Sequence, residues 1–223
     1  MTALLEVRGL WYRYPRDKSH AQAVLRGIDA HIGEGESVGI VGRNGSGKST
    51  LLKVMSNLLR PSQGEIRFGG RPVRLNDHAY RSVLNYCAGA PQGFYPRLTA
   101  SENLRFFSGM KGRMYTPAEA SALLGTVGLG ASSDVKYATF SLGMRQRLHL
   151  ACLLLEPSRI WILDEPTTGL DQEGLEMLEE MLSRAERKTR IVVSHDAALL
   201  SRVTSRTLNL QEGVLTCTNS SCS

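Results

Sequence analysis

The stretch "GRNGSGKST", residues 42–50, decides the fold of this chain. It follows "SVGIVG", a short apolar run typical of a buried strand, and it opens a segment whose apolar residues recur at helical spacing from Gly47 to Leu59. Pro61 is expected to stop that helix. A strand, a glycine-rich loop and a helix in this order predict a loop that cradles phosphate groups, because glycines let the backbone wrap closely around an anion.

The pattern G-x-x-x-x-G-K-S assigns separate roles to the residues of this loop. Successive backbone N–H groups and the helix N-terminus point at the phosphates, and Lys48 adds a positive charge for the β- and γ-phosphates. The Ser49 hydroxyl is a candidate ligand for Mg²⁺. The residues predicted to hold a nucleoside triphosphate here are Gly42, Asn44, Gly45, Ser46, Gly47, Lys48, Ser49 and Thr50.

A second strand, in "RIWILDEP" at residues 159–166, ends in two carboxylates. We predict that Asp164 lies beside the phosphate loop at the carboxyl edge of the sheet and holds Mg²⁺ directly or through water. Glu165 is a candidate base that polarises a water for attack on the γ-phosphorus. Solvated acids in an ordinary turn are the alternative for this pair.

Two further residues have weaker signals. His195 follows the strand in "RIVVSH" and can reach the γ-phosphate from the same edge, although a lone histidine is more often structural. Tyr14, in the β-rich start of the chain, can stack on an adenine ring or simply pack in its strand.

The remaining pattern indicates an α/β fold with a helical interruption. Alternation of apolar and polar residues predicts strands in "LLEVRGLWYRYP" and "AVLRGIDAHI", and "GEIRFGGRPV" predicts a hairpin. Residues 97–155 are expected to be mainly helical, because Thr99 with Glu102 and Thr116 with Glu119 both form capping-box patterns. A helix predicted over 171–187 then separates two apolar strands, which implies a parallel sheet with helices on its faces.

Composition and charge exclude several classes of protein. The 223 residues suit one large domain, and 42% apolar with 22% charged residues is ordinary for a soluble globular protein. The net charge of +6 is a weak indication of anionic partners. Cys87, Cys152, Cys217 and Cys222 lack zinc-ligand spacing, which favours a reducing compartment. We expect no signal peptide and no membrane-spanning segment.

One motif is explained by none of these features. "FSLGMRQRL", residues 140–148, places Ser141 and Gly143 at a predicted helix start, with basic side chains directly after them. Together with Tyr14, the phosphate loop, "RIWILDEPTTGLD" and "VVSH", in this order, it resembles the nucleotide-binding subunit of ABC transporters. A serine–glycine signature followed by the acidic strand is close to unique to that family.

The resemblance implies a fold and a division of the chain. The fold is α/β, a P-loop NTPase (RecA-like) core with a mainly parallel sheet, an N-terminal antiparallel β subdomain and an inserted α-helical subdomain. Residues 1–96 and 156–216 form the core with the β subdomain, residues 97–155 the helical subdomain, and residues 217–223 a tail.

The resemblance also implies an ATPase that works as a head-to-tail dimer. Ser141 and the backbone of Gly143 bind the γ-phosphate of ATP held by the other subunit, in a homodimer or a heterodimer. Tyr14 is similar to the adenine-stacking aromatic, and Asp171 to the aspartate that crosses between the two sites. Asp164 corresponds to the Mg²⁺-associated acid, Glu165 to the catalytic base and His195 to the switch histidine.

Two departures from the family pattern concern the signature and a glutamine. The usual L-S-G-G-Q reads F-S-L-G-M here, which retains the serine and the second glycine. The usual glutamine, which is catalytic and metal-associated, falls on Ala90 without a gap, and Gln92 follows two residues later. A loop of different length that lets Gln92 serve is the interpretation adopted; a chain without this glutamine is the alternative.

The family context also implies partners and a location. Membrane-spanning permease subunits move the substrate, and "GFYPRLT" after Gln92 is expected to face them, although its aromatics can equally pack the helical subdomain. The compact chain is most similar to the small exporter ATPases of ABC-2-type permeases and of cytochrome c haem export, so we expect export. The ATPase is expected to be cytoplasmic, peripheral on the cytoplasmic face of the membrane, with no nucleic acid partner. A scaffold subunit for iron–sulfur assembly is the alternative.

Overall fold

The computed structural model describes residues 3–15 and 23–217, which form two sheets. One sheet has four strands in the order β2-β1-β4-β5, and the other has six in the order β10-β9-β3-β8-β7-β6. The strands are β1 (Ala3–Tyr12), β2 (Leu25–Gly33), β3 (Ser37–Val41), β4 (Gln63–Phe68), β5 (Arg71–Pro72), β6 (Leu84–Cys87), β7 (Ile160–Asp164), β8 (Thr189–Val193), β9 (Arg206–Gln211) and β10 (Val214–Cys217).

The six-stranded sheet is parallel except at one edge. β3, β6, β7, β8 and β9 run in the same direction, and β10 is antiparallel to β9. The pairing sets Leu163 of β7 between Cys87 of β6 and Val192 of β8. The carboxyl ends of β3, β7 and β8 therefore meet at one edge, which is where such sheets bind ligands. The predicted α/β class with a mainly parallel sheet is confirmed.

Seven α-helices and three short 3₁₀ helices connect the strands among the described residues. The α-helices are α1 (Lys48–Met55), α2 (His78–Ser82), α3 (Ala100–Met110), α4 (Pro117–Gly125), α5 (Leu142–Ala151), α6 (Gln172–Arg184) and α7 (Ala197–Val203). The 3₁₀ helices are η1 (Gly130–Ser132), η2 (Tyr137–Thr139) and η3 (Cys152–Leu154). The segment expected to be mainly helical thus contains α3, α4 and α5. Its exact limits as a subdomain stay a prediction.

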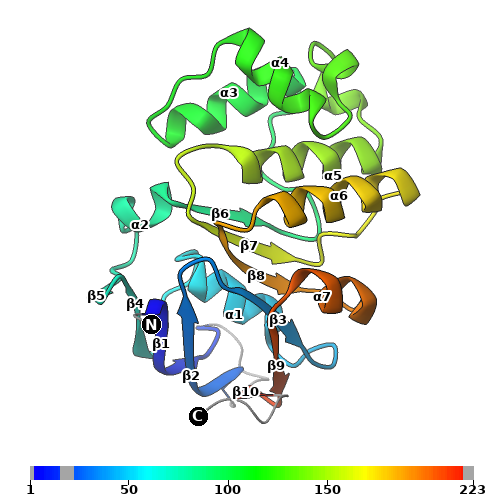
Figure 1. Cartoon of the computed structure of the whole chain (residues 1–223). Coiled ribbons are helices and arrows are strands. Elements are labelled where there is room, and N and C mark those ends of the chain that lie inside the picture. Colours follow the sequence, from blue (N-terminus) through cyan, green and yellow to red (C-terminus); the bar gives the residue numbers. More distant parts are fainter. Residues whose placement is uncertain (1–2, 16–22, 218–223) are drawn as a thin grey trace.

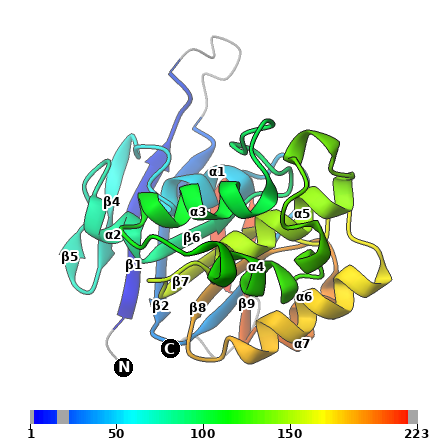
Figure 2. The ribbon, with the colours of Figure 1, turned by 90° about the horizontal axis from the view of Figure 1, so that it is seen from above.

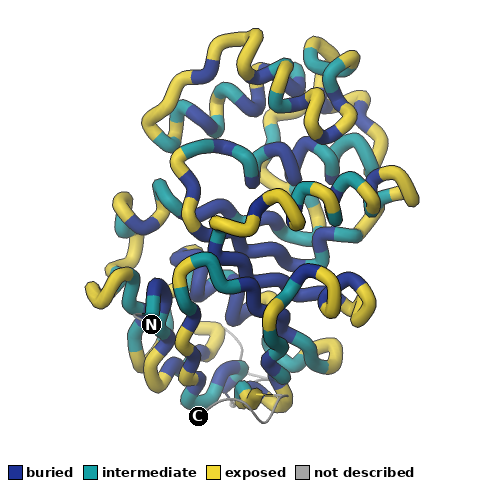
Figure 3. Tube along the Cα trace, viewed as in Figure 1, coloured by how far each residue is buried: buried dark blue, intermediate teal, exposed yellow. Residues whose placement is uncertain are grey.

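The alternation of side chains along β7 builds two cores. Ile160 and Ile162 join a cluster with α1 and the antiparallel sheet, whereas Trp161 and Leu163 join a cluster with α3 to α7. Figure 1 shows the resulting layers, with α1 below β6, β7 and β8 and with α5 and α6 above them. In the view from above, β4 and β5 lie at one side of the molecule and α6 at the other (Figure 2). The burial trace in Figure 3 shows these central strands as the most buried part of the chain.

Helix starts follow the sequence patterns closely. Thr99 and Thr116 cap α3 and α4, and Glu102 and Glu119 each return a bond to the cap, so both predicted capping boxes are confirmed. Ser141, Asp171 and Asp196 also cap their helices with side-chain oxygens. These caps satisfy N–H groups that have no partner inside the helix.

Two predicted boundaries were wrong. The helix after the phosphate loop ends at Met55 and not near Leu59, because Asn57 has a φ of 59° and turns the chain before Pro61. Cys217, which we assigned to the tail, is the last residue of β10 and lies opposite Leu208. Cys222 lies outside the described residues. Within the described part of the chain, no helix has the length and apolar character needed to cross a bilayer.

Candidate functional site

The phosphate loop connects β3 to α1 in a conformation that only glycine permits. A Cβ atom on Gly42 would lie 2.2 Å from the Leu210 carbonyl oxygen, so any side chain there would clash with the backbone. Gly47 precedes α1 with a φ of 104° and supplies no side-chain cap. The first N–H groups of α1 are therefore left free of a side-chain cap, as an anion-binding helix start requires.

Lys48 extends its ammonium group over this loop. The side chain is buried, and its Nζ donates hydrogen bonds to the carbonyl oxygens of Gly42, at 2.7 Å, and Arg43, at 3.1 Å. Both partners are neutral carbonyls, so neither offsets the positive charge that an anionic ligand would meet here.

The two carboxylates occupy different positions at the end of β7. Asp164 is the last residue of the strand and is buried. Glu165 leaves the strand with a φ of 51°, and its backbone N–H donates to the Val193 carbonyl at 2.8 Å. Its side chain faces His195: Oε2 accepts the His195 backbone N–H at 3.2 Å, and Oε1 lies 3.2 Å from the ring Nε2. The candidate base Glu165 and His195 are thus already in contact.

A cavity of about 520 Å³ brings most of the predicted residues together. Its lining includes Tyr14, Asn44, Gly45, Gly47, Lys48, Ser49, Thr50, Asp164, Glu165 and His195. Gly42 and Ser46 belong to the loop that closes it. Val24 also lines this cavity, and nothing in the sequence marked it.

Mg²⁺ fits this cavity through oxygen donors. The exposed Ser49 hydroxyl and the Asp164 carboxylate are the hard ligands that this ion prefers, and both line the cavity. No cluster of three or more His, Cys, Asp or Glu side chains that could hold a metal occurs in the described part of the chain. The ion would therefore need phosphate oxygens and waters to complete its shell, which is the usual arrangement beside a nucleotide.

Tyr14 stands at the open side of the cavity. It is 42% exposed, its hydroxyl lies 3.1 Å from the Thr50 hydroxyl, and its ring meets Tyr12 edge-on at 4.9 Å. An exposed ring face at this place is available to a planar ligand.

The signature residues lie outside this cavity. The Ser141 hydroxyl caps α5 by accepting the Met144 N–H at 3.2 Å, and a Cβ on Gly143 would lie 3.2 Å from the Gly169 carbonyl oxygen. Asp171 caps α6 and pairs with Arg147 at 2.9 Å. The bond from the Gly174 N–H and the Arg147 guanidinium both lower the pKa of Asp171. None of the three predicted residues contributes to the nucleotide cavity of its own chain.

Gln92 also lies outside the nucleotide cavity. It is exposed and lines a second cavity, of about 660 Å³, at the other side of β6. The residue that lies against the two acids is Gly89, where a Cβ would be 3.1 Å from the Asp164 carbonyl oxygen and 3.3 Å from the Glu165 Cβ. The structure therefore does not bring Gln92 to the residues it was expected to assist.

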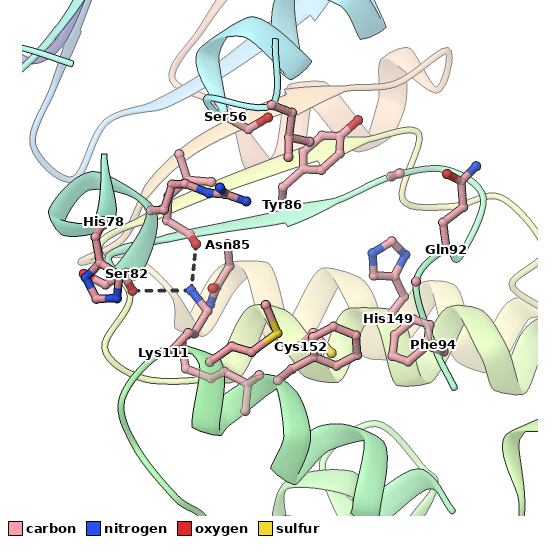
Figure 4. A pocket seen from close by; sticks show the side chains of 18 of the residues that line it. Ser56, His78, Ser82, Asn85, Tyr86, Gln92, Phe94, Lys111, His149 and Cys152 are labelled. Atoms are coloured by element: carbon pink, nitrogen blue, oxygen red, sulfur yellow. Dashed lines mark hydrogen bonds between the residues drawn. The ribbon is translucent and has the colours of Figure 1, made fainter. Parts of the chain in front are cut away.

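This second cavity, here called the groove, lies along the edge strand β6 between the core and the helices (Figure 4). Its apolar lining comes from residues such as Phe94, Phe107 and Met110. His78, Arg81 and Lys111 supply its basic side chains, and the described lining residues include no Asp or Glu. Lys111 closes the strand edge by donating to the carbonyls of Ser82, at 3.3 Å, and Leu84, at 2.8 Å.

His149 projects from α5 into the groove as an uncharged group (Figure 4). Burial lowers the pKa of His149 to about 4, against a smaller opposing effect of the backbone at Tyr86 and Ala88. Its Nδ1 is buried and has no hydrogen-bond partner among the described residues. Burial also lowers the pKa of Lys111, to about 8.

The comparison with known families agrees with this geometry. Residues 25–168, which include the phosphate loop, the groove, the signature helix and both acids, match the family described as "ABC transporter". The chain belongs to the ABC transporter family. It is an ATP-binding subunit with a single cassette, and the members of this family bind and hydrolyse ATP.

Its relatives are small subunits of the same kind. The chain is 38% identical to the lipoprotein-releasing system ATP-binding protein LolD of Geobacter metallireducens, over 96% of this chain and 98% of the relative. It is 36% identical to the cytochrome c biogenesis ATP-binding export protein CcmA of Cupriavidus necator, over 85% and 82%.

Solved structures share the fold. An ATP-binding subunit of an ABC transporter superposes with a TM-score of 0.83 at 29% identity, over 96% of this chain and 90% of the other. The dimeric ATP-binding cassette MJ0796, in a post-hydrolysis state with ADP and Pi, gives a TM-score of 0.85 at 24% identity, over 96% and 99%. The predicted family and P-loop NTPase fold are confirmed.

Proposed function

We propose that this ATPase works as a head-to-tail dimer that binds separate membrane-spanning subunits and drives export of their substrate. The observation that carries the proposal is the division of the site. The cavity holds the phosphate loop, both acids and His195, whereas Ser141 and Gly143 present a helix start elsewhere on the same chain. A second copy or a similar subunit turned head to tail would supply that helix start to the γ-phosphate.

In this proposal the residues of the cavity share the work of hydrolysis. The loop N–H groups and Lys48 bind and orient the phosphates, and Tyr14 stacks on the adenine. Ser49 and Asp164 would hold Mg²⁺, which neutralises phosphate charge when it is bound. Glu165 accepts a proton from the attacking water, and His195, 3.2 Å from it, holds the carboxylate in place.

The dimer gives ATP the role of an adhesive between subunits. Ser141 and the N–H groups at the start of α5 contact the γ-phosphate of the partner's ATP, and Asp171 lies at the crossing between the two sites. Loss of the γ-phosphate on hydrolysis removes these contacts and favours opening.

The groove is the proposed docking site for a helix of the membrane partner. Lys111 already donates to the Leu84 carbonyl of β6 and to the Ser82 carbonyl just before this strand, so an added strand would find that part of the edge occupied. A helix needs only side-chain contacts there. The apolar lining suits an amphipathic helix, and the three basic side chains, without acids among the described lining residues, suit a carboxylate at one end of it. This docking would make the subunit peripheral on the cytoplasmic face of the membrane.

The names of two relatives support the direction of transport. LolD belongs to a lipoprotein-releasing system and CcmA is an export protein. We infer export for this chain on that similarity.

Capture from solubilised membranes of its own cell tests the proposal. The tagged wild-type chain should bring down a multi-spanning protein, and Met110→Glu, which places a charge in the groove, should lose it. Met114→Glu is the matched control, because this methionine is 72% exposed and does not line the groove. Capture of soluble proteins only would contradict the proposal and favour the iron–sulfur scaffold. Equal capture of the membrane protein by both variants would instead reject the groove as its docking site.

A further inference from the structure

Tyr86 lies between the groove and the nucleotide cavity. It belongs to the edge strand β6, its residue lines the groove, and Figure 4 shows its hydroxyl turned away from the helical side. That hydroxyl lies 3.5 Å from Oδ2 of Asp164, which lines the other cavity. The half-buried side chain of Tyr86 thus lines the groove and also contacts a residue of the nucleotide cavity.

The hydroxyl is equipped to donate a hydrogen bond at neutral pH. A phenol has a hydrogen to donate, whereas a carboxylate offers only acceptor oxygens. Tyr86 is therefore the donor and Asp164 the acceptor. A donor on the second oxygen of a metal-binding carboxylate fixes its orientation, and such supporting groups commonly alter metal affinity by about an order of magnitude or more.

Neither Gly89 nor Gln92, in the loop after β6, offers Asp164 a side-chain hydrogen bond among the described contacts. Gly89 approaches Asp164 and Glu165 most closely, and it has no side chain to offer. Gln92 lines the groove but not the nucleotide cavity. Tyr86 can reach Asp164 because the pairing of β6 with β7 sets it opposite Ile162, two residues before Asp164. Residues two apart on a strand point to the same face of the sheet.

We propose that Tyr86 is a positioning residue that orients the metal-binding carboxylate of Asp164 and transmits occupation of the groove to the metal site. Its first part concerns this chain alone. Its second part rests on the proposed function of the groove as the docking site of a membrane partner's helix.

Metal binding to the free chain tests the first part. Mn²⁺ affinity is measured by electron paramagnetic resonance in the presence of a non-hydrolysable ATP analogue, which needs no turnover. Tyr86→Phe should weaken Mn²⁺ binding about threefold to tenfold, as expected for the loss of one hydrogen bond of ordinary net strength. Nucleotide affinity without metal should stay unchanged.

Tyr80→Phe is the matched control. Tyr80 is fully buried, and its hydroxyl donates to the Met55 carbonyl at 2.6 Å instead of to Asp164 or Glu165. Its role is therefore structural. Its loss should lower the free energy of unfolding and leave Mn²⁺ affinity within twofold of wild type. Wild-type Mn²⁺ affinity in Tyr86→Phe, or an equal loss in Tyr80→Phe, would overturn the first part.

The complex purified with its membrane subunits in detergent tests the second part. Mn²⁺ affinity should differ at least threefold between the free and the assembled wild-type chain, and this difference should vanish in Tyr86→Phe. An undiminished difference in the variant would overturn the transmission through Tyr86. A chain that never assembles would instead reject the proposed docking, and with it the second part, while the free-chain result still decides whether Tyr86 orients Asp164.

Discussion

Glu165 is held in a backbone conformation that few residues other than glycine adopt. Its φ of 51° costs of order 1 kcal/mol, and such strain persists where the surroundings fix it. The N–H bond to Val193 and the two contacts with His195 supply that support. The strain therefore directs one carboxylate toward the cavity that also holds Lys48 and Asp164.

Replacing this carboxylate tests its role as the base. Glu165→Gln keeps the shape of the side chain and an acceptor for the His195 N–H, but it cannot take up a proton. Turnover should fall by about 100-fold or more, while ATP affinity changes by less than about threefold. Phosphate release and equilibrium nucleotide binding measure the two effects. The control, Glu180→Gln, alters an exposed carboxylate on α6 and should leave both unchanged. Hydrolysis at the wild-type rate in Glu165→Gln would remove Glu165 from the mechanism.

His149 predicts a dependence of stability on pH. Its pKa falls from 6.5 to about 4 on folding, because burial disfavours the charged ring. Below pH 6.5 the unfolded chain binds a proton at His149 that the native chain does not bind. The free energy of unfolding therefore falls as the pH drops toward 4, and below that pH this group causes no further change. The loss between pH 7 and pH 5 amounts to about 2 kcal/mol from this group.

Urea unfolding of wild type and His149→Gln at both pH values isolates this contribution. Carboxylates whose pKa is lowered by folding, such as Asp171, also make the protein less stable as the pH falls. They are present in both proteins, so their effect cancels in the comparison. The variant should therefore lose about 2 kcal/mol less than wild type on acidification. Parallel losses would show that His149 titrates normally in the folded chain.

At the scale of elements, helix starts were the best-predicted feature. Thr99 and Thr116 fix α3 and α4 through contacts between residues three apart, so the local sequence contains all the information. The ends were harder to predict: α1 ends at Met55, just before Asn57, whose positive φ the apolar spacing did not reveal. The strand "RIWILD" shows no alternation of apolar and polar residues, because α1 covers one of its faces and α3 to α7 cover the other.

The site, too, contains residues whose positions the local sequence predicts and residues whose positions it does not. The phosphate loop and the acids follow strands directly, so their places could be predicted from the sequence. Gln92 could not be placed, because the path of the loop after Cys87 decides which residue meets Asp164, and the loop brings Gly89 there. Tyr86 gave no signal at all, since its contact depends on the register between β6 and β7.

The cap of α4 can be tested with two variants. Thr116→Ala removes the oxygen that accepts the Glu119 N–H at 3.2 Å, and it should lower the free energy of unfolding by about 1 kcal/mol. Thr116→Ser keeps that oxygen and should restore most of the loss. Denaturant unfolding of the three proteins decides, and an alanine variant as stable as wild type would show that the cap is redundant.

At the scale of the whole molecule, the two helix starts that we propose bind phosphate lie apart on the chain. α1 opens into the nucleotide cavity, whereas α5 begins beside Gly169, outside it. The groove lies between the core and the helical part, so a partner bound there is placed to influence how these parts meet. A lone chain has one half of each proposed composite site, which makes association the central claim of the account.

The oligomeric state of Glu165→Gln with Mg-ATP tests that claim most directly. Light scattering after size-exclusion chromatography should show a dimer in saturating Mg-ATP and a monomer without nucleotide, with any heteromeric partner supplied if the chain does not pair with itself. Adding Ser141→Arg, which puts bulk and charge at the start of α5, should abolish the dimer while ATP still binds. A Glu165→Gln chain that binds ATP and stays monomeric beside its natural partners would contradict the account.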